Sequence, residues 1–217
     1  MKTGSWLRAF LFDFGGVLAE EGFRYGLYAI ADRNGLNPDD FLRLATEVIY
    51  ESGFITGDAD ETDYWAMLRE KAGISGTDSK FRNEILDRFI IRPSMLELVG
   101  NLRGRGMRCV ILSDQTCWLD ILEQRYHFCR YFDAVINSFH AGKSKRDPSL
   151  FIETVDMLGL EPGQVMFIDD NEGNIARAAS MGLQTHLFAE ETGFRKALKA
   201  AGLPLLVPRG HFTEKEG

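Results

Sequence analysis

Four short segments place polar side chains at the end of an apolar run or just before a helical pattern. They supply carboxylates, a hydroxyl and an ammonium, from Asp13, Ser113, Asp114, Lys145, Asp169 and Asp170. A carboxylate in an otherwise apolar strand costs free energy unless it faces a site or a partner. Asp13 and the adjacent pair Asp169 and Asp170 are therefore the most informative of these residues.

The chemistry expected of these carboxylates is metal binding. Carboxylates that meet in space repel one another, and a divalent cation removes that repulsion. A small number of hard oxygen ligands favours Mg²⁺, which keeps several waters and often completes its shell with a substrate phosphate. We therefore predict a Mg²⁺ site at these carboxylates.

Five short apolar runs alternate with helix-length segments and predict the framework that positions these residues. The predicted strands are residues 8–14, 107–113, 133–136, 164–170 and 184–188. The predicted helices between and after them are residues 94–105, 117–127, 148–158, 174–181 and 190–201. Near-continuous apolar strands separated by helices indicate right-handed βαβ units, and hence a parallel sheet with helices on both faces. Ligands bind such sheets at the carboxyl ends of the strands, where the polar residues lie.

The stretch after the first strand interrupts this alternation. It contains four helical patterns and no convincing strand, at residues 23–33, 38–51, 61–71 and 78–89. The chain has 217 residues, which corresponds to between one and two domains of ordinary size. We therefore predict a core domain from residues 1–16 and 93–217, and a helical cap from residues 17–92.

Composition and charge exclude several classes of protein. Hydrophobic residues make up 45% of the chain and charged residues 26%, as in ordinary soluble globular proteins. The net charge of −7 gives no electrostatic support for binding nucleic acid or anionic lipid. Three cysteines cannot all pair within the chain, and none forms C-x-x-C, so we predict a reducing, cytoplasmic location. The apolar run 9–12 is cut short by Asp13, so we expect neither a signal peptide nor a membrane span.

Taken together, the four segments resemble the motifs of the haloacid dehalogenase-like hydrolase superfamily. FLFDFGGVL is similar to its first motif, VILS to its second, KRDP to the K-P-D-P around its lysine, and FIDDNEGNIARAASMGL to its acidic fourth motif. The resemblance covers essentially the whole chain and implies an α/β, Rossmann-like core with an inserted helical cap. FDFGGVL is most similar to the phosphatases related to the amino-terminal domain of epoxide hydrolases.

The resemblance implies a role for each matching residue. Asp13 would be the nucleophile that attacks phosphorus to form an aspartyl-phosphate, with Ser113 and Lys145 as further catalytic residues. The implied Mg²⁺ ligands are the Asp13 carboxylate, the Gly15 carbonyl and Asp170, with Asp169 in an outer position. The implied phosphate-binding residues are Ser113, Asp114, Lys145, Gly15 and Gly16. We expect a Mg²⁺-dependent phosphatase of a small phosphomonoester, acting as a monomer or homodimer.

One position departs from the family pattern. These phosphatases usually carry a second aspartate two residues after the nucleophile, which protonates the leaving group, and here Gly15 stands there. General acid catalysis contributes roughly 10²- to 10⁴-fold to a rate. Glu20, Glu21 or Asp114 could replace the missing acid, or the substrate could have a good leaving group.

Two other functions stay open at this stage. One is a metal-independent haloacid dehalogenase, in which the aspartate attacks carbon; the pair Asp169 and Asp170 argues against it. The other is a family member of low activity that binds a phosphorylated ligand, for which Gly15 is the direct hint. Individual residues also have simpler explanations: Asn171 could cap a helix, and Phe54 and Trp65 are assigned to the interior of the cap rather than to a substrate wall.

Overall fold

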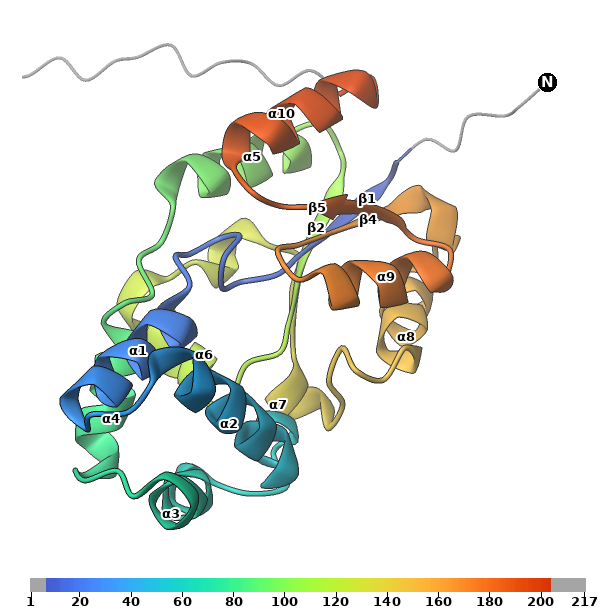
Figure 1. Cartoon of the computed structure of the whole chain (residues 1–217). Helices are drawn as coiled ribbons and strands as arrows, with labels where there is room; N and C mark the ends of the chain where they lie inside the picture. The colour runs from blue at the N-terminus through green and yellow to red at the C-terminus, as the bar shows by residue number, and fades with distance from the viewer. Residues whose placement is uncertain (1–6, 204–217) are drawn as a thin grey trace, which may run out of the picture.

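The computed structural model describes residues 7–203, in which five parallel strands form one sheet with helices on both faces (Figure 1). The sheet order is β3-β2-β1-β4-β5. The strands are β1 (Ala9–Phe12), β2 (Arg108–Ser113), β3 (Ala134–Asn137), β4 (Val165–Asp169) and β5 (Gln184–Leu187). The predicted α/β fold class is confirmed. Residues 1–6 and 204–217 of the predicted core lie outside the described residues.

Side chains of alternate residues along the strands are buried on opposite faces of the sheet. Phe10 and Phe12 belong to one apolar cluster, and Ala9 and Leu11 belong to the other. Helices α5 (Pro93–Arg103), α6 (Trp118–Tyr126) and α10 (Glu191–Ala200) contribute to the first cluster. Helices α8 (Ser149–Leu158) and α9 (Glu172–Ser180) contribute to the second. Strand β1 is therefore enclosed on both faces and both edges, and the residue after it lies at the centre of the sheet's carboxyl edge.

The four helices predicted for the insertion are present and lie together beyond that edge (Figure 1). They are α1 (Gly22–Arg33), α2 (Pro38–Glu51), α3 (Glu61–Ala72) and α4 (Asp78–Leu86). Side chains at their amino ends explain where three of them begin, because Asn37, Asp60 and Thr77 accept hydrogen bonds from the first-turn amides of α2, α3 and α4. Helix α4 ends three residues before the predicted end, since Phe89 leaves the helix to pack on Phe14.

Two neighbouring segments connect these helices to the sheet. Ala19 and Ile91 form an antiparallel bridge, and the Arg92 amide donates to the Leu18 carbonyl at 2.9 Å. The apolar cluster that includes Phe12 also includes Trp65 of α3, so the sheet and the helices share packing. The division into a core (1–16 and 93–217) and a cap (17–92) stays a prediction.

Several short elements were not predicted from the sequence. They are α7 (Ser138–Ala141) and the 3₁₀ turns η1 (Phe54–Thr56), η2 (Cys129–Tyr131) and η3 (Pro162–Gln164). Helix α9 begins at Glu172, two residues earlier than predicted, because Asn171 accepts the Asn174 amide as a cap. Within residues 7–203, every helix is too short or too polar to cross a membrane.

Candidate functional site

Three carboxylates meet at the carboxyl edge of the sheet. Asp13 follows β1, Asp169 is the last residue of the neighbouring strand β4, and Asp170 comes directly after it. One carboxylate oxygen of each lies within 4.8 Å of the others. Adjacent parallel strands explain the meeting, because their ends share one edge. The arrangement gathers hard oxygen ligands closely enough that they could hold a divalent cation.

Lys145 reaches this cluster from the loop before α8. Its Nζ lies 2.6 Å from Asp169 Oδ2 and 3.0 Å from Asp13 Oδ1, and its side chain is 1% exposed. Burial disfavours the charged ammonium, but the Asp13 and Asp169 carboxylates outweigh that effect and raise the pKa of Lys145 above its ordinary value. The cluster therefore contains three carboxylates and one fixed positive charge.

The two oxygens of Asp13 have different surroundings. Oδ1 accepts the Phe14 amide at 2.7 Å and the Ser113 hydroxyl at 2.5 Å, besides facing Lys145. Oδ2 has no hydrogen-bond partner within residues 7–203. Burial raises the pKa of Asp13 above its ordinary value, against the lowering effect of Lys145, and Asp169 adds to the rise. Ser113, at the end of β2, thus fixes one oxygen and leaves the other available.

Asp169 and Asp170 differ in accessibility and in partners. Asp169 is buried; its Oδ1 accepts the Asn171 amide at 2.7 Å, and its Oδ2 accepts Asn174 Nδ2 at 3.0 Å as well as Lys145. The Asp170 side chain lines the cavity of the site. Burial, helped by Asp169, raises the pKa of Asp170. Their surroundings favour Asp170 as a direct metal ligand and Asp169 as the residue that positions Lys145.

Gly15 and Gly16 form the turn after Asp13, and each leaves room for a carboxyl group. Gly16 has φ of +76°, and a Cβ there would lie 2.2 Å from Asp170 Oδ2. The φ angle of Gly15 is not in the positive range, and a Cβ there would lie 3.1 Å from Glu21 Oε1. The turn therefore requires glycine at residue 16, both for its backbone conformation and for the space that Asp170 fills.

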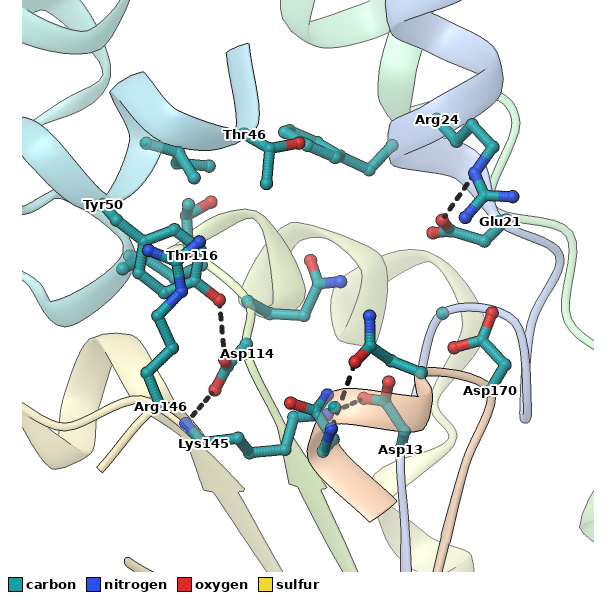
Figure 2. A pocket seen from close by; sticks show the side chains of 18 of the residues that line it. Asp13, Glu21, Arg24, Thr46, Tyr50, Asp114, Thr116, Lys145, Arg146 and Asp170 are labelled. Atoms are coloured by element: carbon teal, nitrogen blue, oxygen red, sulfur yellow. Dashed lines mark hydrogen bonds and ion pairs between the residues drawn. The ribbon is translucent and has the colours of Figure 1, made fainter. Parts of the chain in front are cut away.

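The site opens into a cavity of about 450 Å³ between the sheet edge and the insertion helices (Figure 2). Asp13, Asp170 and Lys145 line its inner part. Arg24 of α1 and Thr46 and Tyr50 of α2 line the opposite side. A small molecule that reached Asp13 would contact both the sheet edge and these helices.

The three carboxylates that could replace the missing acid occupy different environments. Glu20 is outside the cavity lining and pairs with Arg92, whose Nη2 lies 3.0 Å from Glu20 Oε2. Asp114 accepts the Tyr50 hydroxyl at 2.8 Å and the Lys145 amide at 2.7 Å, so both of its oxygens are engaged. Glu21 lines the cavity beside Gly15, and burial, assisted by Asp170, raises its pKa to about 7. Of the three, Glu21 is the one that lies beside Gly15, where the family usually has the aspartate.

Several residues of the site were missed from the sequence. Arg177 Nε donates to the Lys145 carbonyl at 2.8 Å and so holds the lysine loop, while Tyr50 and Arg146 stack at the cavity wall. The only signal for Arg146 was its place in KRDP, where the family has proline. The interior positions expected for Phe54 and Trp65 are confirmed, since both side chains are completely buried.

Comparisons with known proteins identify a family and several relatives. Residues 7–182 match the model of the haloacid dehalogenase-like hydrolase family. The chain is 28% identical to bifunctional epoxide hydrolase 2 of Sus scrofa over an alignment of 223 residues. The alignment covers 92% of this chain and 40% of the relative. It is 30% identical to flavin mononucleotide hydrolase 1 of Arabidopsis thaliana over an alignment of 115 residues, and this alignment covers 53% of this chain and 47% of the relative. The chain thus spans less than half the length of these two relatives.

A solved structure has the same fold. It is a HAD family enzyme from Bacteroides thetaiotaomicron in complex with magnesium and inorganic phosphate, with a TM-score of 0.63 and 20% identity. The match covers 85% of this chain and 96% of that chain.

Proposed function

Because the chain belongs to the haloacid dehalogenase-like hydrolases, we propose that it is a Mg²⁺-dependent phosphatase that hydrolyses a small phosphomonoester through Asp13. The observation that carries the proposal is the cluster of Asp13, Asp169 and Asp170 around Lys145, open to a cavity through Asp13 and Asp170. The phosphatase assignment is further supported by the relatives named for hydrolysis and by the fold neighbour that holds magnesium and phosphate.

The donor set fits Mg²⁺. Asp13 and Asp170 would provide carboxylate oxygens and Gly15 its carbonyl, all of them hard ligands. Three carboxylates with one ammonium leave a local excess of negative charge, which a divalent cation would neutralise. When bound, Mg²⁺ would withdraw charge from the phosphate oxygens.

The residues of the chain supply the rest of the proposed chemistry. Asp13 Oδ2 attacks phosphorus, and the bond from phosphorus to the leaving oxygen breaks to give an aspartyl-phosphate. Lys145 and Ser113 hold Asp13 through its other oxygen and stabilise charge on the phosphoryl group. Water then attacks the aspartyl-phosphate, which releases phosphate and restores the Asp13 carboxylate.

We assign the proton on the leaving alcohol to Glu21. Its carboxyl group lies in the cavity and occupies the space beside Gly15 into which a side chain at residue 15 would extend. The position of Glu21 weighs against a binding protein without turnover, because the carboxyl group lost at residue 15 is supplied from a neighbouring residue. Glu21 would be regenerated when the attacking water gives up its proton.

The experiment that tests this function is a panel of small phosphomonoesters assayed with Mg²⁺ and with EDTA. We expect phosphate release with Mg²⁺ and none with EDTA, and no release by Asp13→Asn, which keeps the shape of the side chain but removes the nucleophile. A short-chain 2-haloacid is included without metal, and halide release would establish the dehalogenase alternative. Phosphate binding without turnover of any ester would instead establish the low-activity alternative. The oligomeric state and the cytoplasmic location stay predictions.

A further inference from the structure

Charged side chains of both signs line the cavity. Asp170 and Glu21, with Arg24 beside Glu21, lie on one side of Asp13, and Arg146, Tyr50 and Asp114 lie on the other (Figure 2). Both oxygens of Asp114 already accept hydrogen bonds, from the Tyr50 hydroxyl and the Lys145 amide. A leaving group with a negative charge would be attracted by the Arg146 guanidinium. Arg146 could therefore orient a substrate that carries a second negative charge.

Arg146 differs from the two other arginines that line the cavity. Arg24 Nε lies 3.8 Å from Glu21 Oε2, and Arg177 Nη2 donates to Asn174 Oδ1 at 2.6 Å. The guanidinium of Arg146 has no carboxylate or hydrogen-bond acceptor within residues 7–203. A guanidinium stays charged at any ordinary pH and binds carboxylate or phosphate through two parallel hydrogen bonds. Its donors are thus available to a ligand.

Arg146 is an exposed residue whose guanidinium stacks on a ring from the opposite side of the cavity. Its Cζ lies 3.4 Å from the centre of the Tyr50 ring, and Tyr50 in turn donates its hydroxyl to Asp114. Asp114 also accepts the amide of Lys145, the residue before Arg146. Lys145 reaches inward to Asp13, while Arg146 stacks on the insertion helix α2 (Figure 2). A charged group that already stacks on a ring loses less conformational freedom on binding a ligand than a free side chain does.

We propose that Arg146, oriented by Tyr50, binds a second anionic group on the leaving part of the substrate, so that the preferred phosphomonoesters carry a carboxylate or a further phosphate. This specificity rests on the proposed phosphatase function.

The test compares substrates that differ in one charge. One pair is 3-phosphooxypropanoate and its primary amide; the other is propane-1,3-diol bisphosphate and the monophosphate. We expect wild type to have a higher kcat/KM for the charged member, and Arg146→Ala to lower the ratio of charged to neutral by about 10- to 100-fold. The pair that responds more strongly identifies the second group as carboxylate or phosphate.

Variants of the neighbouring residues separate binding from general damage. Tyr50→Ala removes the stacking ring and should lower the same ratio, whereas Tyr50→Phe keeps the ring and should retain most of it. Arg105→Ala, an exposed arginine outside the cavity lining, serves as the control and should leave the ratio unchanged. A ratio in Arg146→Ala equal to that of wild type would overturn the proposal.

A binding measurement tests the role of Arg146 even if no ester is turned over. Calorimetry of wild type with Mg²⁺ compares 4-phosphonobutanoate with its amide, two analogues that cannot be hydrolysed at phosphorus. Tighter binding of the charged analogue, lost in Arg146→Ala, would support the assignment, and equal binding would refute it. Absence of turnover for every ester would defeat only the phosphatase function.

Discussion

The ammonium of Lys145 lies 2.6 Å from the Asp169 carboxylate, and both side chains are almost completely closed to solvent. Asp169 is outside the cavity lining, whereas Lys145 reaches the cavity and Asp13. The carboxylate therefore acts on the site through the lysine, whose position it fixes. Removal of Lys145 would leave the Asp13 and Asp169 carboxylates close together without the cation that both of them contact.

We expect Lys145→Met to destabilise the metal-free protein by about 3–5 kcal/mol, the usual effect of breaking a buried ion pair. The free energy of unfolding would be measured by urea denaturation in EDTA. Lys143→Met is the matched control, since Lys143 pairs with Glu153 at the surface and such pairs contribute about 1 kcal/mol or less. Equal losses in the two variants would show that the buried pair has no special importance.

The neighbouring glycines provide a second prediction. Gly16→Ala would place a Cβ 2.2 Å from Asp170 Oδ2 at a positive φ, so Asp170 must move. Because a displacement of about 1 Å can lower a rate about 100-fold, we expect a large loss of kcat and a higher Mg²⁺ requirement. The new Cβ in Gly15→Ala would lie 3.1 Å from Glu21 Oε1 and 3.3 Å from Phe89 Cε1. These contacts are milder than the one at Gly16, so this variant should lose much less activity. The measurement is a Mg²⁺ titration of activity for both variants, with Asp170→Ala as the reference. An equal or larger loss in Gly15→Ala than in Gly16→Ala would contradict the prediction.

The third prediction concerns the leaving group. If Glu21 supplies the proton, Glu21→Gln should lower kcat/KM for alkyl phosphates by about 10²- to 10⁴-fold and should affect aryl phosphates far less, because aryl alcohols leave without a proton. The measurement is a series of esters of increasing leaving-group pKa. Glu20→Gln, one residue away and paired with Arg92, is the control. An identical slope for wild type and Glu21→Gln would assign the proton to another group.

The fourth prediction is a dependence of stability on pH. Burial lowers the pKa of His186, which lies on β5 with its ring centroid 5.1 Å from that of Phe194. The unfolded chain keeps the ordinary value near 6.5 and so binds the proton more readily. The contribution of neutral His186 is therefore present above about pH 6.5 and is lost as the pH falls below it. His186→Phe should reduce the difference in urea stability between about pH 7.5 and about pH 5.5, and an unchanged difference would contradict this.

The sheet and the acidic cluster could be predicted from the sequence because apolar runs end in carboxylates there. The residue pattern alone did not distinguish Asp169 from Asp170, because consecutive side chains at a strand end point in different directions and only the packing decides which is buried. The expectation that Asp169 takes the outer position came from the family resemblance. Tyr50 was not predictable either, since the face of α2 that lines the cavity depends on how the four insertion helices pack. Four-residue elements such as α7 show no periodicity and escape a pattern search.

The sheet order has a consequence for how the protein folds. The first strand of the chain is the middle strand of the sheet, and its partners β2 and β4 begin at Arg108 and Val165. The hydrogen bond from Ser113 to Asp13 accordingly closes a loop of 100 residues. During synthesis the apolar segment Ala9–Phe12 can pair with β2 only after Ser113 has been added and with β4 only after Asp169, and contacts of such long range form slowly. The carboxylate cluster can therefore assemble only after β4 has joined β1.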